Sequence, residues 1–282
     1  MSTYASVLVA LDLGPDVVAR TKLATYLADH FHGHLIGAAG RRLLTIADAV
    51  TQAEVVSAGM VDTDRNLSLS LSLDSASEEL QDVGAIFRQG AGSFERVSVR
   101  TGVEEPSVFL LRQARTADLL VVGRQDRRDP SDWRFAINPG DIVLQAGRPV
   151  LVTPPGADHL SAQQVVVAWK DTREARRAVW DALPFPRKAK EVVICAVGDD
   201  ARHASAWDVQ EHLCRHGVAT EVLGLQRREA TVGDELIQAA ERVGADLIVS
   251  GAYGHSRMRE WVFGGVTCDL LEHAPMCCLM TH

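Results

Sequence analysis

The sequence lacks an uninterrupted apolar run of the roughly 20 residues that a helix needs to cross a bilayer. It also lacks the features of a signal peptide, because the opening residues 1–4 carry no basic start and lead directly into the apolar run 7–11. These two absences predict a cytoplasmic protein that has no membrane partner.

Cysteine is scarce, with five residues in the chain, and no two of them form a Cys-x2-Cys pair. The odd number and the spacing argue against a disulfide framework and against a zinc knuckle. The adjacent residues Cys277 and Cys278 are expected in a strand, with their side chains on opposite faces. We therefore predict that the thiols are buried and reduced.

An excess of positive charge is also missing, since 29 Lys and Arg residues stand against 37 Asp and Glu residues and the net charge is −8. Nucleic-acid binding normally needs a basic surface, so we expect no nucleic-acid partner. The chain has 282 residues, of which 46% are hydrophobic and 23% are charged. This is the composition of one large globular domain or of two ordinary ones.

The common catalytic and metal-binding motifs are absent as well. The sequence contains no His-Glu-x2-His motif and no Gly-x-Ser-x-Gly elbow. Histidines alternate in the segment 30–34, but Gly33 is expected to end a helix there, so their rings need not converge. His212 and His216 have helical spacing but no third ligand follows them. We predict no metal site and assign no catalytic residue.

What the sequence does contain is an internal duplication. The segment "TADLLVVGRQ" at residues 116–125 resembles "GADLIVSGAY" at residues 244–253. In the same way "AGRPVLVTPP" at residues 146–155 corresponds to "HAPMCCLMTH" at residues 273–282. The separation is too long for a solenoid repeat and indicates two copies of one unit.

The stretch 153–158 is rich in proline and glycine, as a linker is, and we predict two domains at residues 1–155 and 160–282. In both halves, runs of Val, Ile and Leu alternate with helical patterns, which indicates a parallel sheet covered by helices on both faces. The predicted fold is therefore α/β, with five strands in each domain. In the second half the expected strands are 165–169, 191–197, 220–225, 246–250 and 276–280. The expected helices there are 173–183, 207–216 and 234–243.

The first half contains an irregular stretch at residues 45–92. Leucine and serine alternate from Leu67 to Leu73, and this period of two suits a strand or an extended edge. Leucine also favours helices, so the same residues are compatible with a helix. The segment 75–89 begins with serines ahead of glutamates and is expected to form a helix.

The segment "GAYGHSRMREWVFGGVT" at residues 251–267 places glycines after the expected strand 246–250 and before an expected helix at 266–272. Glycine lets a backbone approach a ligand closely, and the first N–H groups of a helix attract phosphate. A structural tight turn followed by a helix start is the alternative interpretation. The residues expected to contact a phosphate are Gly251, Gly254, His255, Ser256, Gly264, Gly265, Val266 and Thr267.

This segment and the duplicated strands resemble the universal stress protein family, and the chain looks like two domains of that family in tandem. The resemblance covers nearly the whole chain and is weakest at residues 45–92. It implies Rossmann-like domains of the adenine-nucleotide alpha-hydrolase type, packed as a pseudo-dimer in which strands 150–153 and 277–281 pair. In nucleotide-binding members, the pattern Gly-x2-Gly-x9-Gly followed by Ser or Thr holds the phosphates of ATP.

The second half departs from that pattern because Gly265 stands where a hydroxyl residue is expected, although Thr267 follows. A hydrogen bond to a charged group contributes about 1.5–3 kcal/mol, so ATP or a related nucleotide is expected to bind weakly. The family's aspartate after the first strand is matched by Asp12 in the first half. Trp169 is expected in the core, with a contact to adenine as the alternative. The remaining residues of the predicted site, at the ends of strands, are Trp169, Lys170 and Val197.

The first half departs from the pattern differently. Asp126 stands where the second glycine is expected, and Asn138 and Pro139 stand where Gly264 and Gly265 lie in the second half. Proline has no backbone N–H to donate, and an aspartate repels phosphate. We expect no ATP binding of the usual kind in the first half.

The resemblance implies a regulatory or sensor module of the stress response that binds a small phosphate-bearing ligand and is not a dedicated enzyme. One alternative is a nucleotide-independent scaffold that recruits protein partners and keeps relic pockets. A second is a slow ATPase or an adenylate-handling enzyme. Whether two chains associate into a homodimer stays open.

Overall fold

The computed structural model describes residues 3–43, 62–124, 133–197, 200–225, 231–254 and 265–282, with the backbone alone at 62–72, 197 and 200–204. Ten strands form one continuous sheet in the order β3-β2-β1-β4-β5-β10-β9-β6-β7-β8. The first five are β1 (Ser6–Ala10), β2 (His34–Gly40), β3 (Val97–Gly102), β4 (Leu119–Gly123) and β5 (Val150–Thr153). The other five are β6 (Gln164–Trp169), β7 (Glu191–Val197), β8 (Glu221–Leu225), β9 (Leu247–Gly251) and β10 (Cys277–Thr281).

The strands are parallel within each half of the sheet, and the halves join through an antiparallel pair at its centre. There β5 pairs with β10, with Leu151 opposite Leu279. The order of the strands is mirrored about this pair: it is β3-β2-β1-β4-β5 in the first half and, from the other edge inward, β8-β7-β6-β9-β10 in the second. The predicted α/β class, the five strands in each half and the pairing of the two final strands are confirmed.

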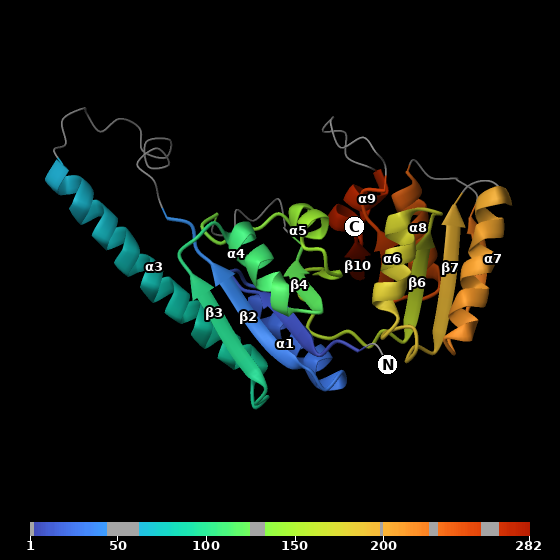
Figure 1. Ribbon diagram of the computed structural model, residues 1–282, viewed down its shortest axis with the longest axis horizontal. Helices are drawn as coiled ribbons and strands as arrows, with labels where there is room; N and C mark the ends of the chain where they lie inside the picture. Colours follow the sequence, from blue (N-terminus) through green and yellow to red (C-terminus); the bar gives the residue numbers. More distant parts are fainter. Residues whose placement is uncertain (1–2, 44–61, 125–132, 198–199, 226–230, 255–264) are drawn as a thin grey trace.

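Two layers of helices cover the sheet (Figure 1). One layer consists of α1 (Val17–His30), α3 (Asp62–Ala91), α6 (Arg173–Ala182) and α7 (Asp200–Arg215). The other consists of α4 (Pro106–Gln113), α5 (Pro139–Gln145), α8 (Val232–Arg242) and α9 (Gly265–His273). Because both faces of the sheet are covered, side chains of alternate strand residues enter different cores. Val165 and Val167 of β6 lie in one core, and Val166 and Ala168 lie in the other.

The cysteines follow the same alternation, and all five are free thiols. Cys277 and Cys278 lie in the opposite cores, as predicted. Cys195 is also buried, whereas Cys214 is exposed and Cys268 is partly exposed. The prediction of burial is therefore wrong for Cys214, because that residue lies on the outer side of α7.

The alternating Leu and Ser run lies inside the 30-residue helix α3, so the strand interpretation of residues 67–73 is wrong. The later part of α3 shows why a helix forms here. Its buried residues recur at intervals of three and four, so they form a stripe on one side of the helix that packs on the core. This stripe consists of Ala76, Leu80, Val83 and Phe87. Figure 1 shows the N-terminal end of α3 extending past the sheet.

The two halves also contact each other through side chains at the amino ends of the strands. Tyr4, Phe31 and Phe185 form an aromatic cluster with ring centroids 5.0–5.5 Å apart. The Tyr4 hydroxyl donates to the Asp181 carbonyl at 2.6 Å, across the boundary between the halves. At the other edge the Arg124 guanidinium donates to the carbonyl of Ala274 at the end of α9. These contacts fix the two halves relative to each other.

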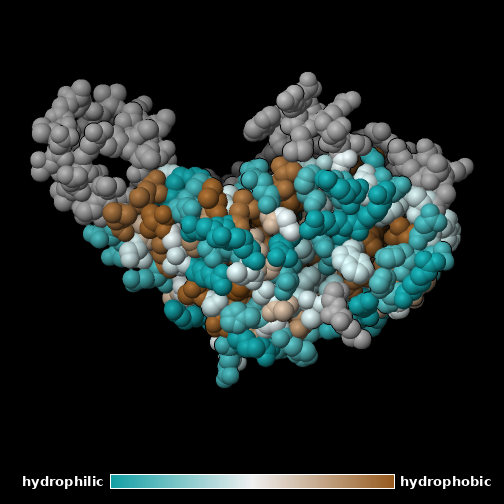
Figure 2. Space-filling model, in the orientation of Figure 1, coloured by the Kyte–Doolittle hydropathy of each residue, from teal (hydrophilic) through white to brown (hydrophobic). Residues whose placement is uncertain are grey.

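The face shown in Figure 2 is mainly hydrophilic among its coloured residues, with small separate hydrophobic patches. No helix in the described ranges is both long and apolar enough to cross a membrane.

Candidate functional site

The predicted site lies at the carboxyl edge of the second half, between β6 and β9. These strands are neighbours, but the chain leaves β6 toward β7 on one side and leaves β9 toward β10 on the other. In α/β proteins, ligands generally bind in a crevice at the sheet edge where such a change of direction occurs. Lys170 follows β6, and Gly251 is the last residue of β9.

Gly251 is in direct contact with the first turn of α6. A Cβ atom at this position would lie 2.4 Å from the backbone nitrogen of Ala175 and 2.6 Å from the carbonyl carbon of Glu174. Neighbouring backbone atoms cannot move away as a flexible side chain can. The close approach of α6 to the end of β9 therefore requires glycine at this position, whatever binds nearby.

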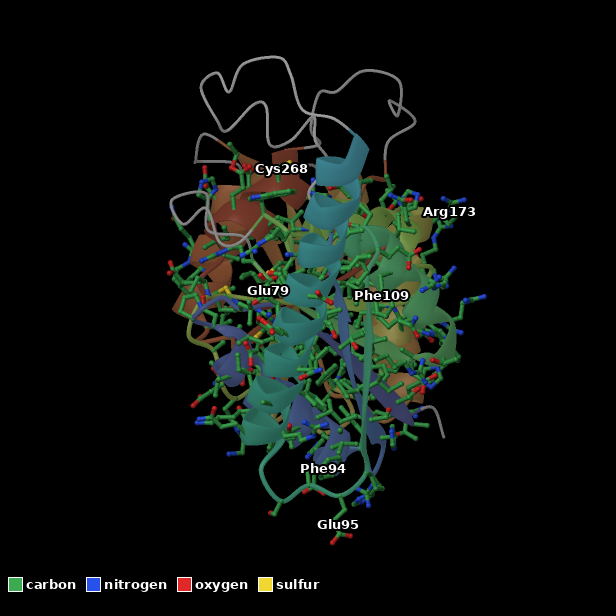
Figure 3. The ribbon with its side chains drawn as sticks, turned by 90° about the vertical axis from the view of Figure 1, so that its left-hand side faces the viewer. Glu79, Phe94, Glu95, Phe109, Arg173 and Cys268 are labelled. Carbon is green, nitrogen blue, oxygen red and sulfur yellow. The ribbon has the colours of Figure 1, made fainter. Side chains whose placement is uncertain are left out.

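Gly254 lies beside a buried carboxylate. A Cβ atom there would meet Glu174 Oε2 at 3.0 Å and Thr172 Oγ1 at 3.2 Å. The Thr172 hydroxyl oxygen accepts from the Ala175 N–H at 3.2 Å and caps α6. Glu174 is 7% exposed and pairs through Oε1 with Arg173, which is itself largely exposed (Figure 3).

The environment of Glu174 favours its charged form. Burial by itself raises the pKa of this carboxyl group, but hydrogen bonds from its own backbone N–H and from Arg173, together with the charge of Arg173 and a hydrogen bond from Thr172, outweigh burial and lower the pKa. A negative charge therefore lies against the second glycine of the loop at neutral pH.

Tyr253, between these glycines, has a left-handed backbone with φ 57°. Its N–H donates to the Thr267 hydroxyl oxygen in α9 at 3.3 Å, so Thr267 already holds the loop. Its side chain reaches the first half, where the hydroxyl lies 2.5 Å from the position of a Cβ atom on Gly140 in α5. Burial, with the nearby Cys268 and Asp141, raises the pKa of Tyr253 to about 12.

A second carboxylate, that of Asp269, lies one turn after the start of α9 and packs against the first turn of α8. Gly265 is exposed, and the atom nearest to a Cβ there is Asp269 Oδ2 at 3.8 Å. The same oxygen is buried and has no hydrogen-bond partner within the described residues. On its other side it lies against Gly233, in the first turn of α8, where a Cβ atom would meet it at 2.4 Å. Figure 3 labels Cys268, which precedes Asp269 on α9.

The other predicted residues lie in different surroundings. Trp169 is 7% exposed in the core beneath α6 and α7, and its indole N–H donates to Ser205 Oγ at 3.0 Å. Lys170 is exposed at the end of β6, and Val197 ends β7, where its backbone pairs with Leu225. His255, Ser256 and Gly264 lie outside the described residues, as does Asp126 in the first half.

In the first half the corresponding crevice contains an internal ion pair. The Arg20 guanidinium, 5% exposed, donates to Asp12 Oδ2 at 2.6 Å and to the Ala10 carbonyl at 3.0 Å. A Cβ atom on Gly123, which ends β4, would lie 2.4 Å from Arg20 Nη1. The Gly14 N–H donates to the other oxygen of Asp12 at 2.8 Å. The chain's own groups thus occupy the position at which a ligand would meet the strand ends.

The helix that follows this crevice begins with proline. Pro139 is the first residue of α5, and the Asn138 side chain accepts from the Gly140 N–H at 2.9 Å. A small hollow of about 10 Å³ lies over the ends of β1 and β2, with Phe135 and Ile137 in its lining. It has room for about one water molecule.

The described parts of the chain contain no cluster of three or more histidines, cysteines or carboxylates with metal-binding geometry. Burial raises the pKa of the Cys195 and Cys277 thiols to about 12, so both stay protonated at neutral pH.

Sequence reasoning did not identify Glu174, Asp269 or Arg20, whose side chains lie against Gly254, Gly233 and Gly123 respectively. In the sequence each looks like an ordinary charged residue of an amphipathic helix. The glycines at 233 and 123 are the only local signal, because each admits one of these side chains, and their meaning requires the tertiary contact.

Together these features define a two-halved α/β protein with one sheet, in which an internal ion pair between Arg20 and Asp12 lies at the strand ends of the first half. Residues 161–282 match the model of the Universal stress protein family. No curated protein sequence matches the chain. A universal stress protein structure from Archaeoglobus fulgidus is similar with a TM-score of 0.66 at 15% identity, over 98% of each chain. A protein of unknown function from Pseudomonas aeruginosa gives a TM-score of 0.54 at 13% identity, over 99% of this chain and 92% of that one. These likenesses show the fold.

The contact of Tyr253 with Gly140 predicts coupling between the halves. Gly140→Ala is expected to lower the free energy of unfolding by about 1–3 kcal/mol, because its Cβ overlaps the Tyr253 hydroxyl. Tyr253→Phe removes that hydroxyl and should restore part of the loss in the double variant. Urea unfolding of the two single variants and the double variant measures the coupling. Strictly additive losses contradict the contact.

Proposed function

We propose that the whole chain is a tandem universal stress protein, with domains at residues 1–155 and 160–282. It acts as a cytoplasmic regulatory or sensor module, and its second domain binds ATP or another small phosphate-bearing ligand weakly. The mirrored strand orders and the pairing of β5 with β10 support the tandem arrangement. The family match to the second half supports the choice of family.

One observation carries the ligand proposal. The start of α9 lies beside the residues that follow β9, because the Tyr253 N–H donates to the Thr267 hydroxyl oxygen, and Gly265, the first residue of α9, is exposed. The first N–H groups of a helix have no partner within the helix and attract anions. The first half has Pro139 at this position, which offers no N–H. The following N–H, that of Gly140, already donates to the Asn138 side chain. This difference supports ligand binding in the second half alone.

The nucleotide-independent scaffold remains the alternative, and three contacts favour it. The close approach of α6 by itself explains the glycine at position 251. The Thr267 hydroxyl oxygen already accepts a hydrogen bond from the Tyr253 N–H. Glu174 places a carboxylate beside Gly254. In this alternative the crevice is a relic and the surface binds protein partners.

The variant Gly265→Pro tests the ligand proposal. Proline is tolerated at the first position of a helix, as Pro139 shows in α5, but it removes one amide donor. We expect an unchanged fold by circular dichroism and a loss of about tenfold or more in affinity for ATP or inorganic phosphate, measured by calorimetry.

Pro139→Gly is the matched control in the first half and should leave the affinity unchanged. Equal affinities of the wild type and Gly265→Pro would show that the start of α9 does not contribute to ligand binding. Absence of binding to the wild type at millimolar ligand supports the scaffold alternative.

A further inference from the structure

The outer face of α6 carries positive charge, against the overall balance of the chain. Residues 170–190 contain seven Lys and Arg residues and three Asp and Glu residues, whereas the whole chain has a net charge of −8. On α6, the side chains of Arg173, Arg176 and Arg177 are 77%, 62% and 50% exposed. Figure 3 shows Arg173 pointing away from the body of the molecule. Residues three and four apart on a helix lie on one face, so the three guanidinium groups share a face.

Trp180 lies on the same face, one turn after Arg176 and Arg177. It is 53% exposed, although tryptophan is on average a highly buried residue. Its ring packs edge to face against that of His216, with the centroids 5.7 Å apart. Arg187 Nη2 lies 3.1 Å from His216 Nδ1, so a fourth guanidinium group lies close to this tryptophan. We use the name α6 face for the exposed residues Arg173, Arg176, Arg177 and Trp180.

The acidic neighbours of these arginines leave the α6 face able to bind further carboxylates. Asp171 pairs with Arg176 at 2.6 Å, but both side chains are more than half exposed, so water screens the pair and weakens it. Asp181 pairs with Arg177 at 3.4 Å. Both arginines make their contacts through Nε and Nη2. A guanidinium group has further N–H donors, and these are suited to a carboxylate of another molecule.

We propose that the α6 face binds an acidic peptide segment of a partner protein, with an apolar side chain of the segment packed on Trp180. Arginine and tryptophan are among the residues that contribute most to protein interfaces. The face is short, since Arg173 and Trp180 are about 10 Å apart along the helix axis. A short acidic segment fits within it, whereas a long polyanion would extend over a chain with excess negative charge and be repelled. This inference is independent of the proposed function, because it does not involve the start of α9.

Fluorescence anisotropy tests the proposal with a labelled, glutamate-rich peptide of about ten residues that has a central phenylalanine and crosses the face when extended. We expect binding that weakens about tenfold in the double variant Arg173→Gln, Arg176→Gln and about tenfold in Trp180→Ala. Added salt should weaken it as well, because the charges are exposed. A peptide with glutamine in place of glutamate should bind the wild type at least about tenfold more weakly. The substituted side chains are exposed, so the circular dichroism of the variants should be unchanged.

Trp207→Ala and Arg96→Gln are the matched controls, and each should change the affinity by less than about twofold. Trp207 is 56% exposed on α7, more than two turns before His216, and Arg96, with a 51% exposed side chain, precedes the edge strand β3 in the first half. Equal losses in the controls and in the variants of the α6 face, or no binding of the peptide at millimolar concentration, overturn the proposal. Tighter binding of an oligonucleotide or of phosphatidylserine vesicles than of the peptide overturns the choice of partner. Self-association of the chain that Arg176→Gln abolishes overturns it in favour of a second copy.

Discussion

Asp12→Ala is expected to lower the free energy of unfolding by about 3–5 kcal/mol, because it leaves the Arg20 guanidinium buried without its carboxylate. Arg20 is 5% exposed, and its guanidinium lies against Ala10 at the end of β1 and Gly123 at the end of β4. The Ala10 carbonyl would remain its acceptor, and one carbonyl does not neutralise a charge. Urea unfolding followed by circular dichroism measures the loss.

The reverse substitution should cost less. Arg20→Met removes the charge and fills the space with an apolar side chain, while Asp12, whose side chain is 32% exposed, stays hydrated and keeps the Gly14 N–H. We expect a loss of about 1–2 kcal/mol. Glu211→Ala breaks an exposed ion pair with Arg215 and serves as the control, with an expected change below about 1 kcal/mol. Equal losses for Asp12→Ala and Glu211→Ala would show that the buried pair has no special role.

Gly251→Ala is expected to destabilise the ligand-free protein by about 3 kcal/mol or more. The added methyl group would overlap the backbone of Glu174 and Ala175, so α6 must move away from the end of β9. Thermal or urea unfolding without ligand is the decisive measurement, because a glycine kept solely for phosphate would tolerate alanine when no ligand is present.

Substitutions at two other glycines serve as controls for the stability loss expected of Gly251→Ala. Gly254→Ala meets side-chain atoms at 3.0–3.2 Å and should cost about 1 kcal/mol or less, since Glu174 and Thr172 can adjust. Gly84→Ala lies within α3 with its nearest atom at 3.9 Å, and should stabilise the protein by about 0.5–1 kcal/mol. A Gly251→Ala variant as stable as Gly254→Ala would falsify the structural account of Gly251.

The positions of most elements follow from local sequence. The run 191–197 is predicted as a strand and has the same bounds as β7, because the apolar residues 192–197 suit a strand buried on both faces. The predicted strand 276–280 differs from β10 by one residue at each end. The predicted helix at 207–216 begins later than α7, whose first turns, from Asp200, have no regular apolar spacing.

The candidate site was less accessible to such reasoning. The sequence indicates glycines at the carboxyl edge and a helix starting close to Gly265, and the structure has α9 there. It does not reveal that Gly251 contacts α6, that Glu174 lies beside Gly254, or that Asp269 packs against Gly233. Trp169 shows the same limit, since its hydrogen bond to Ser205 joins residues from β6 and α7 that no local pattern connects.

By itself the sequence determined the α/β class, the duplication and the places where glycine and proline begin or end an element. These features depend on backbone preference and on apolar periodicity, which neighbouring residues specify. Only the tertiary structure decided that Arg20 lies against Asp12 at the strand ends of the first half and that Glu174 lies beside Gly254 in the second. Distances between charges depend on how separate helices pack against one sheet, and a linear pattern does not contain that information.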